Sequence, residues 1–272
     1  MKRELSYITF IDILFILLLS VSGGATGVFS EILYYFAFAA PIALGIYFIR
    51  IAPKENNTAK LGIKLTRDGT TKTIPLIFPV ITLIFSISLL TSLMMKLFGF
   101  RDETVIEEAL PLAIVLHALI PAVLEEMLFR YIPLRMTLSH SKRHAVLFSA
   151  LFFSLCHTDL FRIPYAFAAG VLFALVDIMA ESVLPSVILH FLNNVLSLVF
   201  MEYFGEENGT VFSLILIVLS IISIIPIIIK RKSYRGFFSP LLEKGDSAEI
   251  SKAPLALVFV TLALAVTNLL SR

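Results

Sequence analysis

Two adjacent carboxylates, Glu125 and Glu126, end an apolar run and are followed by Arg130. On a helix, neighbours point about 100° apart, whereas residues four apart share a face. We therefore expect Arg130 to neutralise Glu126, which leaves Glu125 to face another partner. Such a carboxylate can act as a general base on a water molecule. The alternative is a plain ion pair at a helix end, with Glu125 reaching toward water.

Two further apolar stretches each contain a histidine. His157 ends the short, phenylalanine-rich stretch Ala145–His157. His190 lies in the middle of Val183–Met201, and Asn194 follows four residues later on the same helix face. Taken singly, these residues suit packing or hydrogen bonds between membrane helices.

Together these side chains suit hydrolysis. A carboxylate beside a histidine can hold and deprotonate a water, and a histidine with an asparagine can donate hydrogen bonds to the oxyanion of an attacked carbonyl. No covalent nucleophile is needed, since Cys156 points about 100° away from His157 on a helix. A zinc site made of Glu125, His157 and His190 competes with this interpretation, although the sequence lacks the His-Glu-x-x-His run of zinc peptidases.

The composition shows which elements must carry these side chains. The 272 residues are 58% apolar and only 15% charged, with a mean hydropathy of +0.93. A soluble chain of this length cannot hide so much apolar surface, and disordered chains and disulfide-stapled modules are excluded as well. The single Cys156 permits no disulfide within the chain, and the net charge of +2 gives no reason to expect a nucleic acid partner.

A membrane-spanning helix needs about 20 mostly apolar residues. We therefore predict an all-α fold, a polytopic transmembrane helical bundle of about eight or nine membrane segments. Asp12 inside the first stretch and the many later stretches favour a retained helix over a signal peptide. The nine candidate stretches are Leu5–Ser22, Ile32–Ile49, Ile74–Met95, Ala109–Phe129, Ala145–His157, Ile163–Ala180, Val183–Met201, Val211–Ile229 and Pro254–Leu270.

The basic residues predict the orientation. Cytoplasmic connections are rich in Lys and Arg. If the N-terminus is cytoplasmic, every second connection between the stretches is cytoplasmic as well. These cytoplasmic segments contain 18 of the 22 basic residues, including Arg130. We expect an integral, multi-pass membrane protein with its N-terminus cytoplasmic, in the cell membrane if the source is prokaryotic. For Glu125 and His157 to share a water, the helix that begins near Ala109 must run past Arg130 to about Thr137.

The three motifs resemble those of the CAAX prenyl protease and bacteriocin-processing (CPBP) family of intramembrane endopeptidases. The family patterns are Glu-Glu-x-x-x-Arg, Phe-x-x-x-His and His-x-x-x-Asn. They are matched in order by Glu125–Arg130, Phe153–His157 and His190–Asn194. The resemblance covers about Ala109–Met201 and predicts three regions: N-terminal transmembrane segments over 1–104, a CPBP-like catalytic core over 105–202, and C-terminal transmembrane segments over 203–272.

The resemblance also implies roles for the motif residues. Glu125 would be the general base on the water, assisted by His157, with Glu126 near the same water. His190 and Asn194 would form the oxyanion site, and the structural supports would be Arg130 and Phe153. A glutamate-type endopeptidase of this kind needs no cofactor; a metalloendopeptidase holding Zn²⁺ with Glu125, His157 and His190 is the alternative.

The expected partners are the lipid bilayer and a membrane-associated peptide or protein substrate, lipidated or not. Eukaryotic relatives remove the last three residues of prenylated proteins, and some bacterial members are linked to bacteriocin immunity or maturation. Two other functions compete with peptide hydrolysis. One is a non-catalytic immunity or scaffold membrane protein with the same fold. The other is an ion-coupled transporter in which the glutamate and the histidines relay protons, although no paired broken helices of inverted repeats are evident.

Overall fold

The structure is a computed structural model that describes residues 1–24, 26–51, 61–97, 108–157, 159–229, 234–243 and 252–270. The chain divides into two compact units. The first unit comprises Met1–Leu61, Leu124–Ala174 and Pro240–Arg272, and the second comprises Gly62–Val123 and Leu175–Ser239.

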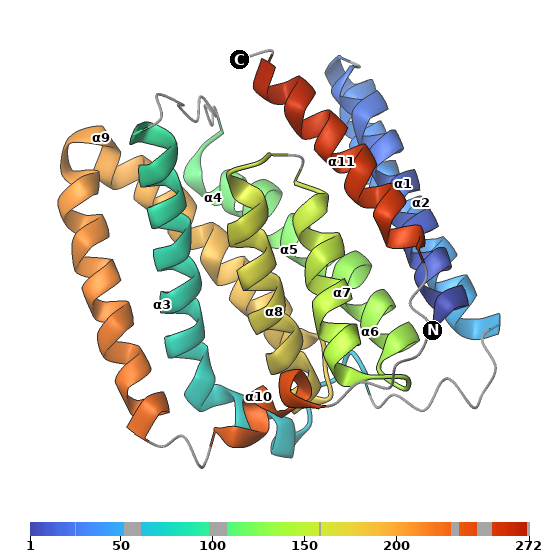
Figure 1. Cartoon of the computed structure of the whole chain (residues 1–272). Coiled ribbons are helices and arrows are strands. Elements are labelled where there is room, and N and C mark those ends of the chain that lie inside the picture. Colours follow the sequence, from blue (N-terminus) through green and yellow to red (C-terminus); the bar gives the residue numbers. More distant parts are fainter. Residues whose placement is uncertain are drawn as a thin grey trace. The chain divides into compact units, whose positions relative to one another are not determined.

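The first unit is built on the N-terminal helix α1 (Lys2–Gly23), against which α2 (Gly27–Ile51) and α11 (Ala253–Leu270) both pack (Figure 1). It also contains the π-helical turn η3 (Met127–Tyr131), α6 (Ile132–Thr137) and α7 (Lys142–Leu155). Its buried apolar cluster joins α1 to these helices, with the rings of Phe15 and Phe129 5.5 Å apart. Most of α8 (Arg162–Ala180) and the end of α5 (Ile120–Glu126) complete the unit.

The second unit is built on α3 (Arg67–Leu97), which packs along α9 (Leu184–Ile229) (Figure 1). The π-helical segment η2 (Ile114–Leu119) packs on α9 too and follows the short α4 (Leu110–Ala113). The helix α10 (Arg235–Leu242) begins in this unit. In Figure 1 the α9 ribbon bends sharply and runs back, so its two arms match the two apolar stretches predicted there.

Among the residues that the structure describes, five helices are long and apolar enough to cross a membrane: Lys2–Gly23, Phe29–Ile51, Arg67–Met95, Leu110–Thr137 and Arg162–Ala180. Shorter apolar helices cover Leu184–Phe200 and Pro254–Thr267. With α7 and the second arm of α9, every one of the nine predicted stretches is helical. The prediction of an all-α membrane bundle is therefore confirmed.

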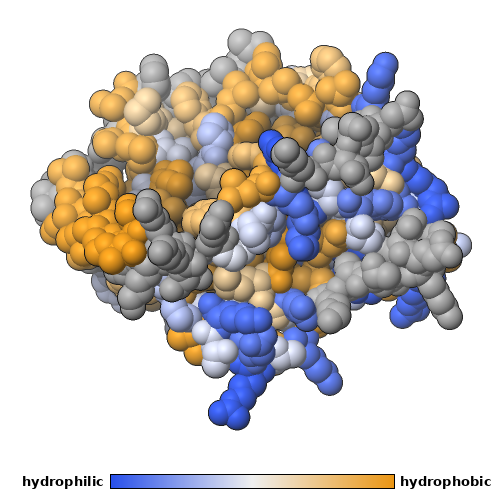
Figure 2. Space-filling view, turned by 60° about the horizontal axis from the view of Figure 1, so that its bottom comes forward, coloured by the Kyte–Doolittle hydropathy of each residue, from blue (hydrophilic) through white to orange (hydrophobic). Residues whose placement is uncertain are grey.

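Large apolar side chains lie on the surface of these helices, as lipid-facing positions require. Phe29, Phe78 and Phe259 are 62%, 63% and 71% exposed, respectively. Broad hydrophobic areas are visible in Figure 2. In water such areas would be an aggregation hazard or an interaction site, whereas in a bilayer they face hydrocarbon. The protein is thus an integral membrane protein.

Candidate active site

Glu126 and Arg130 form a completely buried ion pair in the first unit. The Arg130 Nε lies 3.5 Å from a Glu126 carboxylate oxygen, and both side chains are 0% exposed. The pairing expected from their four-residue spacing is confirmed. Because opposite charges taken out of water must be paired to be tolerated, neither side chain can be removed alone without a large cost.

Arg130 lies within a helix, whereas the count of basic residues placed it in a connection between apolar stretches. The sequence count placed Arg130 in a cytoplasmic connection, but the helix runs from Leu110 to Thr137 and holds Arg130 inside it. Its pairing with Glu126 makes this buried position acceptable for an arginine. The expected continuation of this helix to about Thr137 is confirmed.

Three helices close around the Arg130 guanidinium. Its Nη1 donates to the carbonyl oxygens of Phe129 at 3.2 Å and of Ser149 at 3.5 Å. The guanidinium carbon lies 4.3 Å from the centre of the Phe153 ring, a cation–π contact. On α8, a Cβ at Gly170 would lie 3.3 Å from Nη2 and 2.9 Å from the Cα of Ala150, so a glycine allows the close approach of α8 to α7.

A proline explains why the Phe129 carbonyl is available to this network. Pro133 lies four residues beyond Phe129 and has no N–H to donate to its carbonyl. The Phe129 carbonyl accepts from the Ser149 hydroxyl at 2.6 Å and from Arg130. The adjoining turn is π-helical, with the Ile132 N–H donating to Met127, five residues back. Such turns are frequent at functional sites.

The first two motifs meet at Phe153. Its ring contacts both the Arg130 guanidinium and the His157 ring, and the two ring centres are 4.9 Å apart in an edge-to-face arrangement. The His157 Nδ1 lies 3.0 Å from the Phe153 carbonyl oxygen, which can only accept, so Nδ1 carries the hydrogen. In the neutral ring Nε2 is then the basic nitrogen. His157 itself lies just beyond α7, after Cys156 at its C-terminal cap.

Glu125 lies in the same unit and is half-buried, whereas Glu126 is fully buried. Glu125 is close enough to the Cys156 thiol and to Tyr34 of α2 to interact with both electrostatically. Asp12 of α1 also interacts with Cys156. Carboxyl groups from two different helices therefore act electrostatically on Cys156, the residue that precedes His157.

Sequence reasoning noted Asp12 only as a charge inside an apolar stretch. The structure shows that its side chain is 0% exposed. Among the described residues, neither carboxyl oxygen of Asp12 has a hydrogen-bond partner. Ser149 and Gly170 were not predicted at all, because a small residue in an apolar helix is ordinary packing until its neighbours are known.

His190 and Asn194 belong to the second unit, on the first arm of α9. His190 is buried, at 6% exposed, and Asn194 is half-buried one turn later. The structure thus groups Glu125, Glu126, Arg130, Phe153 and His157 in one unit, and His190 with Asn194 in the other.

His117 of η2 also lies in the motif region. His117, in the second unit, has a side chain 45% exposed and lies 3.4 Å from a Glu108 carboxylate oxygen, as a surface pair. In the part of the chain that the structure describes, no three His, Cys, Asp or Glu side chains gather as metal ligands would. The zinc set considered from the sequence draws on both units, with Glu125 and His157 in the first and His190 in the second, and we derive no step through a metal.

Comparison with known families supports the motif-based resemblance. The family model described as type II CAAX prenyl endopeptidase Rce1-like matches residues 107–196, about a third of the chain. The matched segment contains all three motifs in order. Comparison with curated proteins and with solved structures gives no match. Residues 107–196 are thus similar to Rce1-like members of the CAAX protease (CPBP) family, and the match supports intramembrane endopeptidase activity in general.

Proposed function

We propose that this protein is an intramembrane endopeptidase that hydrolyses a peptide bond of a membrane-associated protein or peptide. The observation that carries the proposal is the buried chain of contacts from Glu126 through Arg130 and Phe153 to His157, within the family-matched segment. Charges are costly inside a membrane helix bundle and persist mainly where they serve function. Here the buried pair supports the ring that orients a histidine.

In the proposed reaction, Glu125 takes a proton from a water molecule that His157 helps to hold, and the water oxygen attacks the carbonyl carbon of the scissile bond. His190 and Asn194 donate hydrogen bonds to the resulting oxyanion, each worth about 2.7–4 kcal/mol of barrier in comparable sites. When the carbon–nitrogen bond breaks, the proton held by Glu125 passes to the leaving amine. Water is thereby divided between the two products, and no covalent intermediate forms.

The proposal requires residues of both units to act on the same substrate. Glu126 would support Arg130 and lie near the same water, and Phe153 would fix the His157 ring. The substrate would approach from the bilayer, and a lipid group on the peptide would be one way to hold it there.

We further propose that the N-terminus is cytoplasmic and that a prokaryotic source would carry the protein in its cell membrane. The N-terminal transmembrane segments would cover residues 1–104, the catalytic core 105–202 and the C-terminal transmembrane segments 203–272.

The test uses the purified full-length protein in liposomes with a quenched fluorescent peptide that ends in a Cys-aliphatic-aliphatic-X sequence, farnesylated or unmodified. Glu125→Gln and His190→Ala should each reduce cleavage at least 100-fold without unfolding the helices. Glu31→Gln, which neutralises an exposed glutamate of α2, is the matched control and should keep full activity. Undiminished cleavage by both site variants would refute the proposal, and the preferred peptide would show whether a lipid group is recognised.

The glutamate mechanism also predicts metal independence. Elemental analysis of the purified protein should find no stoichiometric zinc, and chelators should leave cleavage unchanged. One zinc per chain in the wild type, lost in His157→Ala, would favour the metalloendopeptidase alternative instead.

A further inference from the structure

The start of α9 is held by an acid from the preceding helix. Asp177 lies in the last turns of α8 and is 0% exposed. Its Oδ1 accepts the backbone N–H of Ser186 at 3.0 Å. Ser186 is the third residue of α9, where helical N–H groups have no partner within their own helix. Asp177 therefore caps α9 from outside, in the place of the usual capping residue just before a helix.

A second contact holds the turn between the two helices. The segment before α3 pairs with this turn like a strand, with the Gly62 N–H donating to the Glu181 carbonyl and the Val183 N–H donating to the Gly62 carbonyl, both at 3.0 Å. The Ser182 N–H donates to the Asp177 carbonyl at 3.1 Å. The turn is tight enough to force Glu181 to a φ of 53°, an uncommon conformation for a residue with a side chain.

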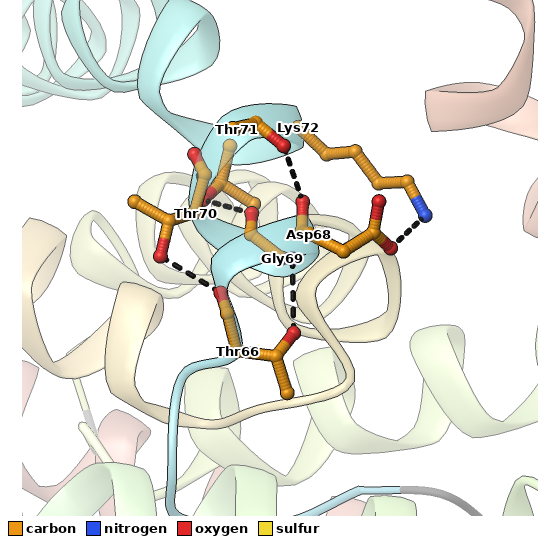
Figure 3. Close-up of polar contacts among 7 residues, drawn as sticks. Thr66, Asp68, Gly69, Thr70, Thr71 and Lys72 are labelled. Atoms are coloured by element: carbon orange, nitrogen blue, oxygen red, sulfur yellow. Dashed lines mark hydrogen bonds and ion pairs between the residues drawn. The ribbon is translucent and has the colours of Figure 1, made fainter.

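The first turn of α3 completes the corner. Thr66 caps this helix by accepting the Gly69 N–H at 3.0 Å, and the Asp68–Lys72 ion pair lies on its exposed side (Figure 3). A Cβ at Gly69 would lie 2.6 Å from the Ala180 carbonyl oxygen, so only glycine permits α3 to approach the end of α8 this closely. The start of α9 is thus fixed by α8 and by the beginning of α3, all within the second unit.

The anchored residue is in register with the third motif. His190 lies four residues after Ser186, and Asn194 lies four residues after His190, so all three fall near one face of α9. Four residues advance a helix by about 6 Å. Slippage of the first turn by one residue would move His190 by about 1.5 Å along the axis and by about 100° around it.

We propose that Asp177 is a positioning residue, which fixes the first turn of α9 and thereby the height and rotation of His190 and Asn194. It contacts the helix backbone and acts on the substrate only through these two side chains. The anchoring follows from the contacts themselves, whereas its effect on catalysis rests on the proposed function. A displacement of about 1 Å at a catalytic group can cost about 100-fold in rate.

The test compares Asp177→Ala with Asp177→Asn, whose amide oxygen can still accept the Ser186 N–H. The Ala variant should lower kcat for the liposome cleavage assay about 10- to 100-fold with KM within threefold, because binding the peptide does not need the oxyanion donors. The Asn variant should restore kcat to within threefold of the wild type. Asp68→Ala, which removes an exposed acid from the first turn of the neighbouring helix, should leave kcat unchanged.

Amide hydrogen exchange supplies a measurement that does not depend on activity. In Asp177→Ala the amides of residues 186–190 should exchange at least 10-fold faster, with exchange in α1 and α7 unchanged. The Asn variant should keep the wild-type protection. Unchanged exchange in Asp177→Ala, or an Asn variant as impaired as the Ala variant, would overturn the proposed anchoring. If exchange is faster in Asp177→Ala but the wild type cleaves no peptide, the contact of Asp177 with α9 is confirmed. The proposed function and the catalytic part of this inference are then refuted.

Discussion

The guanidinium of Arg130 contacts both the carboxylate of Glu126, 3.5 Å from its Nε, and the face of the Phe153 ring, 4.3 Å from its Cζ. The buried charge is thus neutralised by a carboxylate and also contacts the face of an aromatic ring. Lysine cannot replace it, because an ammonium group lacks the planar fork that makes several such contacts at once.

Breaking this pair should destabilise the protein strongly. Arg130→Met leaves Glu126 buried without its cation, which typically costs about 3–5 kcal/mol. The double variant Glu126→Gln with Arg130→Met removes both charges and should recover at least half of that loss. Free energies of unfolding in detergent micelles check this, with the exposed Arg143→Met as the control, expected within about 0.5 kcal/mol of the wild type. A double variant less stable than Arg130→Met would show that the pair is not the source of the loss.

Replacing Phe153 with leucine should affect cleavage more than folding. The substitution keeps an apolar side chain but removes the ring that contacts both Arg130 and His157. A desolvated cation–π contact is worth about 2 kcal/mol. We expect kcat to fall about 10-fold in the liposome assay, while Phe148→Leu on the same helix, whose ring stacks on Phe152, leaves kcat unchanged. Equal effects of the two variants would argue against a role for Phe153 in orienting His157.

Asp12 should be dispensable for stability. A buried carboxyl group without hydrogen bonds costs about 1–3 kcal/mol on the scale of protein mutations. Asp12→Leu should therefore raise the free energy of unfolding in micelles, and Asp12→Asn should change it little. The proposed mechanism uses Glu125 and gives Asp12 no part, so both variants should cleave peptide normally. A folded Asp12→Asn protein without activity would show that a second acid takes part.

His140 should make the fold sensitive to mild acid. It lies between α6 and α7, with its Nε2 3.7 Å from a Glu4 carboxylate oxygen. Burial lowers the pKa of the His140 imidazole, and the nearby Glu4 only partly opposes this. The unfolded chain then binds a proton more readily than the folded protein, so stability is complete above about pH 6.5 and declines as the pH falls below that value.

Thermal unfolding between pH 7.5 and 5.5 checks this expectation. His140→Gln should lose less stability over that interval than the wild type, because the glutamine takes up no proton. If the unfolding temperatures of the two proteins fall equally with pH, the acid sensitivity comes from other groups.

The features that sequence predicted correctly are local. Apolar length located the helices, and the four-residue spacing of Glu126 and Arg130 predicted their pairing. The complete burial of Arg130 within a helix was not predicted, because an arginine after an apolar run resembles an interfacial residue unless its neighbours are known. Ser149 and Gly170 reach Arg130 from α7 and α8, and Asp177 reaches Ser186 across a turn. Helical periodicity carries no information about contacts between different helices.

A double-mutant cycle on cleavage tests most directly whether residues of both units act in one reaction. The four proteins are the wild type, Glu125→Gln, His190→Ala and the double variant, each assayed for kcat/KM in liposomes under single-turnover conditions. If the carboxylate and the imidazole serve the same transition state, each single change should cost at least 100-fold and the second change should add less than 10-fold. Losses that multiply fully in the double variant, or single variants that cleave like the wild type, would contradict the proposed mechanism.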